Sequence, residues 1–186
     1  MLEAQICQYA QRKGFHPRTL ERWLDWDQPD RDALFRLAIS LKIGENHLRD
    51  LMDWLEEIRL RDQSKIREIL ASKPITDVES DPRLGRADML KRIKEEIRRL
   101  RFPRLAQTED SIRARIQELK LHPEIRLTVP PGLEGGRLQI ALSASSHDEL
   151  RRLTVKLANA ADKDIVREIF GFLTGPAKES RPKASK

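Results

Sequence analysis

The stretch Ile6–Asp25, ICQYAQRKGFHPRTLERWLD, decides how the N-terminal part of this 186-residue chain folds. Gly14 is a good residue to end a helix, because glycine adopts a positive φ without strain. Pro17 suits the first turn of a second helix, since its φ is already helical and its missing N–H needs no partner there. The stretch therefore predicts two short helices, at about residues 2–13 and 17–26, joined by a tight turn.

This pattern resembles the helix-turn-helix of DNA-binding regulators. That motif needs a small residue where its two helices cross, and Ala10 lies there, with Gly14 four residues later in the turn. In such motifs the N-terminal part of the second helix reaches base edges in the major groove. A packed helical hairpin without any role in DNA binding is the alternative. The apolar positions of the motif are filled by Phe15, Leu20, Trp23 and Leu24.

The outward-facing polar side chains of this motif are expected to contact DNA. Arg18 and Arg22 can bond guanine edges or phosphate, and Thr19 suits phosphate at a helix N-terminus. The acidic residues between positions 25 and 32 would repel phosphate if they faced the duplex. The predicted contacts are Arg12, Lys13, His16, Arg18, Thr19 and Arg22.

Positive charge is concentrated in one segment of the chain. The net charge is +6, yet residues 1–82 hold 13 basic and 16 acidic side chains, whereas residues 83–104 hold 9 and 3. Such clustering favours contact with a polyanion, and a solvated helix face with internal ion pairs is the alternative. A basic helix is predicted at about residues 86–100, and its expected phosphate contacts are Arg86, Lys91, Arg92, Lys94, Arg98, Arg99 and Arg101.

The rest of the N-terminal region also has the apolar spacing of helices. Helices are predicted at about residues 30–42 and 45–61, and Ser64 is expected to cap a short fifth helix. Residues 72–84 contain two prolines and several acids, and they are interpreted as a linker. The expected divisions are a helix-turn-helix domain (1–72), the linker with the basic helix (73–105), an α+β module (106–175) and a disordered basic tail (176–186).

The pattern changes after residue 105. Thr108 is expected to open a helix, and two runs of alternating apolar residues, at 125–129 and 138–142, predict strands joined by a long loop. Ser146 and Glu149 have the spacing of a capping box at the start of a further helix. The last helix is expected at about residues 163–173.

The predicted fold class is therefore mainly α, with an N-terminal helical domain that contains the helix-turn-helix and a small C-terminal α+β module of helix–strand–strand–helix–helix. A two-stranded sheet is barely stable alone. It must pack on its own helices or pair with a second copy, and the second option favours a homodimer.

The helix-turn-helix and the helix after it, GENHLRDLMDWLEEI at Gly44–Ile58, together resemble part of the ParB-like partition proteins. In that family, a helix-turn-helix domain with several following helices binds a centromere-like DNA site, and a separate C-terminal module dimerises. The resemblance covers about the first half of the chain, and it implies DNA binding of the chromosome- or plasmid-partition or transcription-regulator type. The nucleotide-binding domain of that family has no counterpart here, so nucleotide hydrolysis and clamp sliding are not implied.

The sequence shows no catalytic or metal-binding pattern. His16, His47, His122 and His147 lack metal spacing with one another or with Cys7, and no phosphate-binding loop appears. We therefore expect no enzyme activity and no cofactor. A single cysteine and the lack of an 18-residue apolar run favour a cytoplasmic, nucleoid-associated protein without a membrane partner. The expected partners are double-stranded DNA and a second copy, and the alternative is a protein-interaction or scaffold subunit of a larger assembly.

Overall fold

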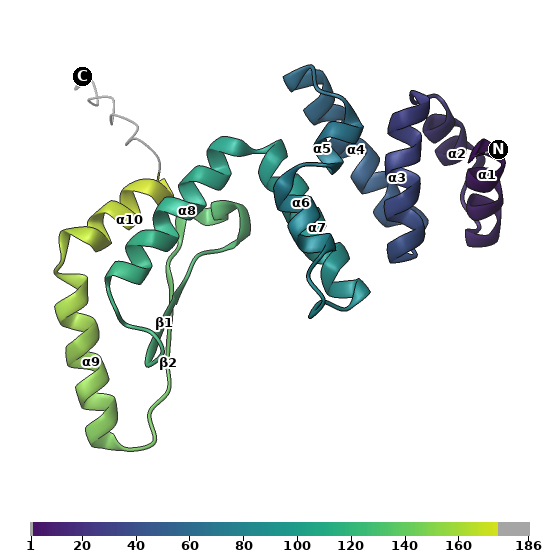
Figure 1. Ribbon diagram of the computed structural model, residues 1–186. Coiled ribbons are helices and arrows are strands. Elements are labelled where there is room, and N and C mark those ends of the chain that lie inside the picture. Colours follow the sequence, from purple (N-terminus) through teal and green to yellow (C-terminus); the bar gives the residue numbers. More distant parts are fainter. Residues whose placement is uncertain (1, 175–186) are drawn as a thin grey trace, which may run out of the picture. The chain divides into compact units, whose positions relative to one another are not determined.

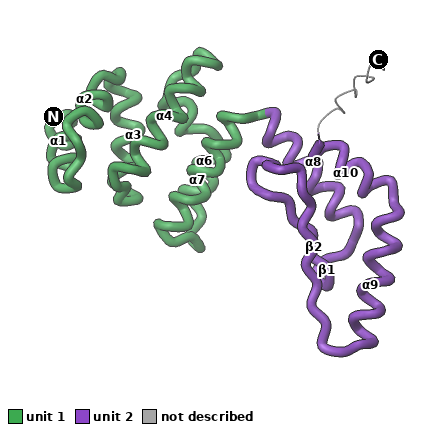
Figure 2. Tube along the Cα trace, turned by 180° about the vertical axis from the view of Figure 1, so that it is seen from behind, with its two compact units in different colours: residues 1–103 green, residues 104–186 purple. Residues whose placement is uncertain are grey.

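The computed structural model describes residues 2–174, most of which are helical (Figure 1). The chain divides into two compact units, residues 1–103 and residues 104–186 (Figure 2). Each unit has a hydrophobic core of its own. The predicted fold class, mainly α with a small C-terminal α+β module, is confirmed.

The first unit is built from helices, several of which pack on helices that do not adjoin them in the chain. Helix α4 contacts α2, α5 and α7, and helix α7 also contacts α3 and α6. The helices of this unit are α1 (Leu2–Lys13), α2 (Pro17–Leu24), α3 (Gln28–Leu41), α4 (Glu45–Asp62), α5 (Ile66–Leu70), α6 (Lys73–Glu79) and α7 (Arg86–Arg101).

Helix α4 supplies much of the core of the first unit. Leu48, Leu51, Met52 and Leu55 are completely buried. Their spacing of three and four residues places them on one face of the helix, as the sequence predicted. Because this face is buried, the polar residues of α4 are left on its flanks, beside α2 and α7.

The turn between α1 and α2 has the local geometry expected of the motif. Gly14 has a φ of +68°, and the amide of Phe15 donates to the carbonyl of Ala10 at 2.9 Å. Ala10 and Trp23 are buried where the two helices meet the core. Glycine is needed at this turn because a side chain would be strained at that φ.

The segment interpreted as a linker is helical in the structure. Lys73–Glu79 forms α6, whose Ile75 is completely buried and which packs on α7. Pro74 lies in the first turn of this helix, where proline starts a helix rather than breaking it. The unit boundary therefore follows Pro103, not residue 72, and the basic helix belongs to the first unit.

Helix α5 begins differently from the prediction. Ser64 does not cap it; instead the amides of Ile66 and Arg67 donate to the carboxylate of Asp30 at 3.2 and 3.0 Å. Asp30 lies in the acidic stretch at residues 25–32, and its side chain is buried. A side chain from α3 thus provides the N-terminal cap of α5 from a distant part of the sequence.

The second unit has the predicted order of helix, two strands and two helices. Helix α8 begins directly after α7 instead of at Thr108, and the hydroxyl of Thr108 donates to the carbonyl of Arg104 inside that helix. The elements are α8 (Pro103–Glu118), β1 (Ile125–Thr128), the irregular helical segment η1 (Pro131–Gly136), β2 (Gln139–Leu142), α9 (His147–Ala161) and α10 (Asp164–Thr174).

The two strands form an antiparallel sheet in which Leu127 lies opposite Ile140 and Ile125 opposite Leu142. Ile125 and Leu127 are buried in the core of the second unit, whereas Ile140 is 49% exposed. Neither strand has a second neighbour within residues 2–174. One face of the sheet therefore packs on the core of the second unit. Ile140 of β2 points to that same face but remains half exposed.

Helix α9 begins with the predicted cap. The hydroxyl of Ser146 accepts a hydrogen bond from the amide of Glu149 at 3.2 Å. The carboxylate of Glu149 accepts from the amide of Ser145 at 2.7 Å rather than from Ser146. The reciprocal bond of the capping box is thus made one residue earlier.

Within residues 2–174, no helix combines the length and the apolar character needed to cross a membrane. The basic tail predicted to be disordered, residues 176–186, lies outside the described residues.

Candidate nucleic-acid interface

The N-terminus of α2, the predicted DNA-reading helix, is bonded to a carboxylate of the same chain. Glu45 accepts a hydrogen bond from the amide of His16 at 2.9 Å and from the hydroxyl of Thr19 at 2.6 Å. The bond from Thr19, and then that from His16, holds the pKa of Glu45 below its usual value. This carboxylate lies where the positive end of a helix favours an anion.

Thr19 was predicted to face outward, and that prediction is wrong. The side chain is buried, and its hydroxyl is used in the bond to Glu45. The cause is the close approach of the start of α4 to α2, which the sequence of the motif alone does not reveal. His16 is exposed, but its Nδ1 accepts from the amide of Arg18 at 3.2 Å and so caps the helix.

Arg22 was also predicted to face outward, but it is bound to α4. Its guanidinium donates to Asp53 at 2.6 Å and makes two bonds to Glu56, at 3.1 and 2.6 Å. The bonds to Glu56 are the largest cause that raises the pKa of Arg22 above its usual value. Trp26 donates its indole N–H to the same carboxylate at 2.8 Å. Reading of a base by Arg22 would require these bonds to break.

Arg18 and Arg49 remain accessible beside the start of α2. Both are exposed, and together they line an open depression of about 480 Å³ at the ends of α2 and α4. Its polar lining suits hydrated anions more than apolar ligands. The full set of lining residues is His16, Arg18, Thr19, Arg22, Glu45 and Arg49.

Arg12 and Lys13 lie on a different surface from this depression. Both are exposed on α1, and both line a groove between α1 and α3. The ammonium of Lys13 donates to the backbone carbonyl of Lys42 at 3.0 Å and lies 6.0 Å from the ring centre of Tyr9. These two cations therefore do not extend the anion site at α2.

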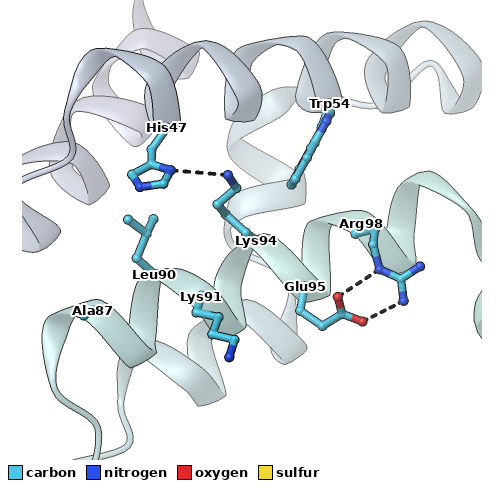
Figure 3. Close-up of a pocket in the computed structure, with 8 residues that line it drawn as sticks. All are labelled: His47, Trp54, Ala87, Leu90, Lys91, Lys94, Glu95 and Arg98. Carbon is cyan, nitrogen blue, oxygen red and sulfur yellow. Dashed lines mark hydrogen bonds and ion pairs between the residues drawn. The ribbon is translucent and has the colours of Figure 1, made fainter. Parts of the chain in front are cut away.

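Lys94, on the basic helix α7, is held against α4. Its ammonium donates to Asp50 at 2.7 Å. It also lies 3.3 Å from Nδ1 of His47 and 5.0 Å from the ring centre of Trp54 (Figure 3). A cation over an indole face gains energy from the ring quadrupole. The ammonium of Lys94 is thus already engaged in the packing of α4 on α7 and is not free for an external ligand.

Two further cations of α7 are also paired with carboxylates, one within α7 and one on α4. Arg98 makes two bonds to Glu95, one turn away, as Figure 3 shows. Arg101 makes two bonds to Glu57 of α4, one of them at 2.7 Å. Arg99 is partly buried. Part of the positive charge between residues 83 and 104 is therefore neutralised within the first unit.

The remaining predicted cations of α7 are exposed. Arg86, Lys91 and Arg92 all face solvent. Among the described residues, no hydrogen bond or ion pair engages the side chains of Arg86 and Lys91. The pKa of Asp81 is lowered mainly by hydrogen bonds from Arg83, and the charge of Arg92 adds a smaller effect. Lys91 also lines a depression of about 330 Å³ between α4 and α7, whose apolar walls include Trp54 and Leu90.

The acids of α4 bind the predicted contact residues of α2 and α7, and the sequence analysis did not find these partners. Asp50 and Glu57, seven residues apart, face α7, while Asp53 and Glu56 face α2. A spacing of seven or three residues keeps each pair on one side of a helix. That spacing was visible in the sequence, but the partners on α2 and α7 were not.

No group of three or more histidine, cysteine, aspartate or glutamate side chains is arranged to hold a metal ion in the part of the chain that the structure describes. Comparisons with protein-family models, with curated proteins and with solved structures found no match for this chain.

Proposed function

We propose that this protein binds double-stranded DNA as a homodimer, in the manner of a partition protein or a transcription regulator. The observation that carries the proposal is the α1–turn–α2 arrangement with its open, cationic depression at the start of α2. A helix N-terminus beside exposed arginines is suited to a phosphate group. A protein with this function would act on the nucleoid in the cytoplasm.

The contacts in this proposal are fewer than those expected from the sequence. Arg18 and Arg49 act at the start of α2, and Arg86, Lys91 and Arg92 act on α7. Contacts of this kind to phosphate position a protein on DNA without reading its sequence. Because Arg22 is bound to α4, we propose backbone binding as the main source of affinity.

The second copy would join through β2. Antiparallel pairing of β2 with the β2 of another copy places one residue opposite itself, and the choice of that residue fixes the register. Pairing centred on Ile140 places Leu138 of one copy opposite Leu142 of the other. All three side chains share the covered face, so the pairing would cover the exposed Ile140 with an apolar neighbour.

The ion pairs of α4 favour a second candidate function. Arg22, Lys94 and Arg101 are all engaged by carboxylates of this helix, which weakens the case for a polyanion partner. A protein-interaction subunit of a larger assembly needs no such polyanion surface. The two candidates differ in their response to DNA.

The test is a titration of fluorescently labelled random-sequence duplex DNA with the full chain at several salt concentrations. We expect micromolar binding at low salt. The logarithm of the association constant should fall linearly with the logarithm of the salt concentration, because phosphate contacts release counterions. Arg86→Ala with Lys91→Ala should reduce that slope by about 0.9 for each phosphate that is no longer neutralised. Lys94→Ala is the matched control on the same helix and should leave the slope unchanged. Absence of binding at low salt would contradict the proposal and favour the protein-interaction subunit.

A further inference from the structure

A second groove lies along the seam between α1 and α3, away from the start of α2. It measures about 480 Å³. Its residues on α1 are spaced by three and four, so they share one face of that helix. Phe35 and Ile39 are one turn apart on α3, and Lys42 follows at the end of that helix. The complete lining is Gln5, Gln8, Tyr9, Arg12, Lys13, Phe35, Ile39 and Lys42.

The floor of this groove is apolar and rigid. The ring of Tyr9 meets the rings of Phe15 and Phe35 edge to face, at centroid distances of 5.8 and 6.1 Å. Its hydroxyl donates to the carbonyls of Ala38 and Ile43 at 2.9 and 2.7 Å, which fixes the ring between the helices. The groove is therefore formed before any ligand arrives, and binding costs little reordering of the protein.

Within the groove, the apolar side chain of Ile39 is exposed to solvent. It is 49% exposed. Covering such a side chain contributes on the order of 25 cal/mol for each Å² of apolar surface removed from water. The groove thus provides a position for one apolar anchor of a ligand.

The rim of the groove is entirely cationic or neutral. Arg12, Lys13 and Lys42 line it together with the amides of Gln5 and Gln8, and no carboxylate is among the lining residues. This differs from the depression at α2, where Glu45 lies among the cations, and from that between α4 and α7, where Glu95 does. Charge complementarity therefore requires an anionic ligand with an apolar side.

We propose that the groove between α1 and α3 binds an acidic amphipathic helix of a partner protein. Such a helix places its apolar side chains on Ile39 and Tyr9 and its carboxylates beside the three cations. The span from Gln5 to Lys13 along α1 is about 12 Å, which matches roughly two turns of a docked helix. The proposal is independent of DNA binding, because it uses a different surface.

Two other occupants fit the groove less well. Duplex DNA presents phosphates to the rim but nothing apolar to the floor, which would stay in contact with water. Residues 176–186 of this chain hold 4 basic residues and 1 acidic residue, so the three cations of the rim would repel them. An acidic protein segment satisfies both the floor and the rim.

The test uses a fluorescein-labelled synthetic peptide with leucines at helical spacing and Asp or Glu at the other positions. Anisotropy titration with the full chain at low salt should give micromolar binding. A control peptide with Lys in place of the acids should not bind. Failure of the acidic peptide to bind at low salt would overturn the proposal.

Substitutions then locate the site. Ile39→Glu and Arg12→Glu should each weaken peptide binding at least tenfold, because each puts a carboxylate at the groove. Leu60→Glu is the matched control, since Leu60 is an 80% exposed apolar residue on α4, outside the groove. Circular dichroism checks that each variant is folded. Equal weakening by Ile39→Glu and Leu60→Glu, or displacement of the peptide by unlabelled duplex DNA, would overturn the assignment.

Discussion

Glu45 lies at the start of α4 with its carboxylate bonded to two groups at the start of α2. A negative charge at this place has two opposite consequences. It stabilises the N-terminus of α2, and it repels a phosphate approaching Arg18 and Arg49. Since its pKa is held below the usual value, the carboxylate is ionised at neutral pH. The charge of Glu45 therefore limits the affinity of the depression for anions.

Removal of that charge should tighten DNA binding. Glu45→Gln keeps an acceptor for Thr19 but loses the charge, and we expect duplex DNA to bind about fivefold more tightly at low salt. Anisotropy titration measures the effect. Asp148→Asn is the control, because it also removes one negative charge but at a fully exposed position of the second unit, outside both proposed DNA contacts. Equal gains in the two variants would mean that only net charge matters and that DNA does not approach α2.

Asp30 is a residue whose role is structural. Its buried carboxylate accepts from the amides of Ile66 and Arg67, and the former amide is buried as well. Asp30→Ala leaves these donors without a partner, so we expect the free energy of unfolding to fall by about 3 kcal/mol. Urea denaturation followed by circular dichroism measures it. Asp27→Ala, at the exposed N-cap position of α3 where the side chain makes no cap hydrogen bond, should lower stability by less than about 1 kcal/mol.

At the scale of elements, α4 organises the charges of the first unit. One side of this helix carries carboxylates for α2 and the other carries carboxylates for α7. Opposite charges on neighbouring helices favour their packing over alternative arrangements, although exposed pairs of this kind add little stability each. The basic helix α7 is thus a packing partner of α4 as well as a candidate DNA contact.

The elements also show what the sequence could and could not predict. Apolar periodicity located α3, α4 and α7, and alternation located both strands, because these patterns follow from which face is buried. The end of α1 was located from Gly14. The helix α6 was missed because Pro74 and the acids around it were interpreted as breakers. The capping of α5 by Asp30 was missed because its partners lie far away in the sequence. Local patterns determine elements, whereas contacts between distant residues decide which side chains are available.

The absence of distant contacts from sequence patterns also explains which predicted contact residues are exposed and which are not. Arg18, Arg86 and Lys91 were identified from the sequence and are exposed. Thr19 and Arg22 lie on the same short helix but are bound to α4. Helical spacing gives the direction of a side chain, but it does not reveal a carboxylate that comes from another helix.

The strand β2 makes a separate prediction about assembly. If a second copy pairs with β2, Ile140→Lys should place two like charges face to face and prevent dimer formation. Sedimentation velocity of the full chain should show a dimer for the unsubstituted protein and a monomer for the variant. Val155→Lys, at an exposed apolar position on α9, is the control and should remain dimeric. A monomer in the unsubstituted protein would contradict pairing through β2.

At the scale of the whole molecule, the chain has two separate hydrophobic cores. Separate cores unfold independently unless a large apolar interface couples them. Leu51 is completely buried in the first unit and Ile169 in the second. The two cores therefore allow the stability of each unit to be changed separately.

Calorimetry of the full chain should resolve two transitions. Leu51→Ala should lower the stability of the first unit by about 3 kcal/mol, and Ile169→Ala should lower that of the other by a similar amount, because each leaves a cavity. Each substitution should leave the transition of the other unit unchanged. A single cooperative transition lowered by both substitutions would show that the units are coupled.

The division after Pro103 also has a consequence for synthesis of the chain. The buried core of the first unit is formed by residues between Ile6 and Ile97, so it needs no residue of the second unit. Because translation proceeds from the N-terminus, the first unit can complete its core while the second is still emerging from the ribosome. We therefore expect nascent chains to become protease-resistant in two steps, the first of them before the sheet of the second unit exists.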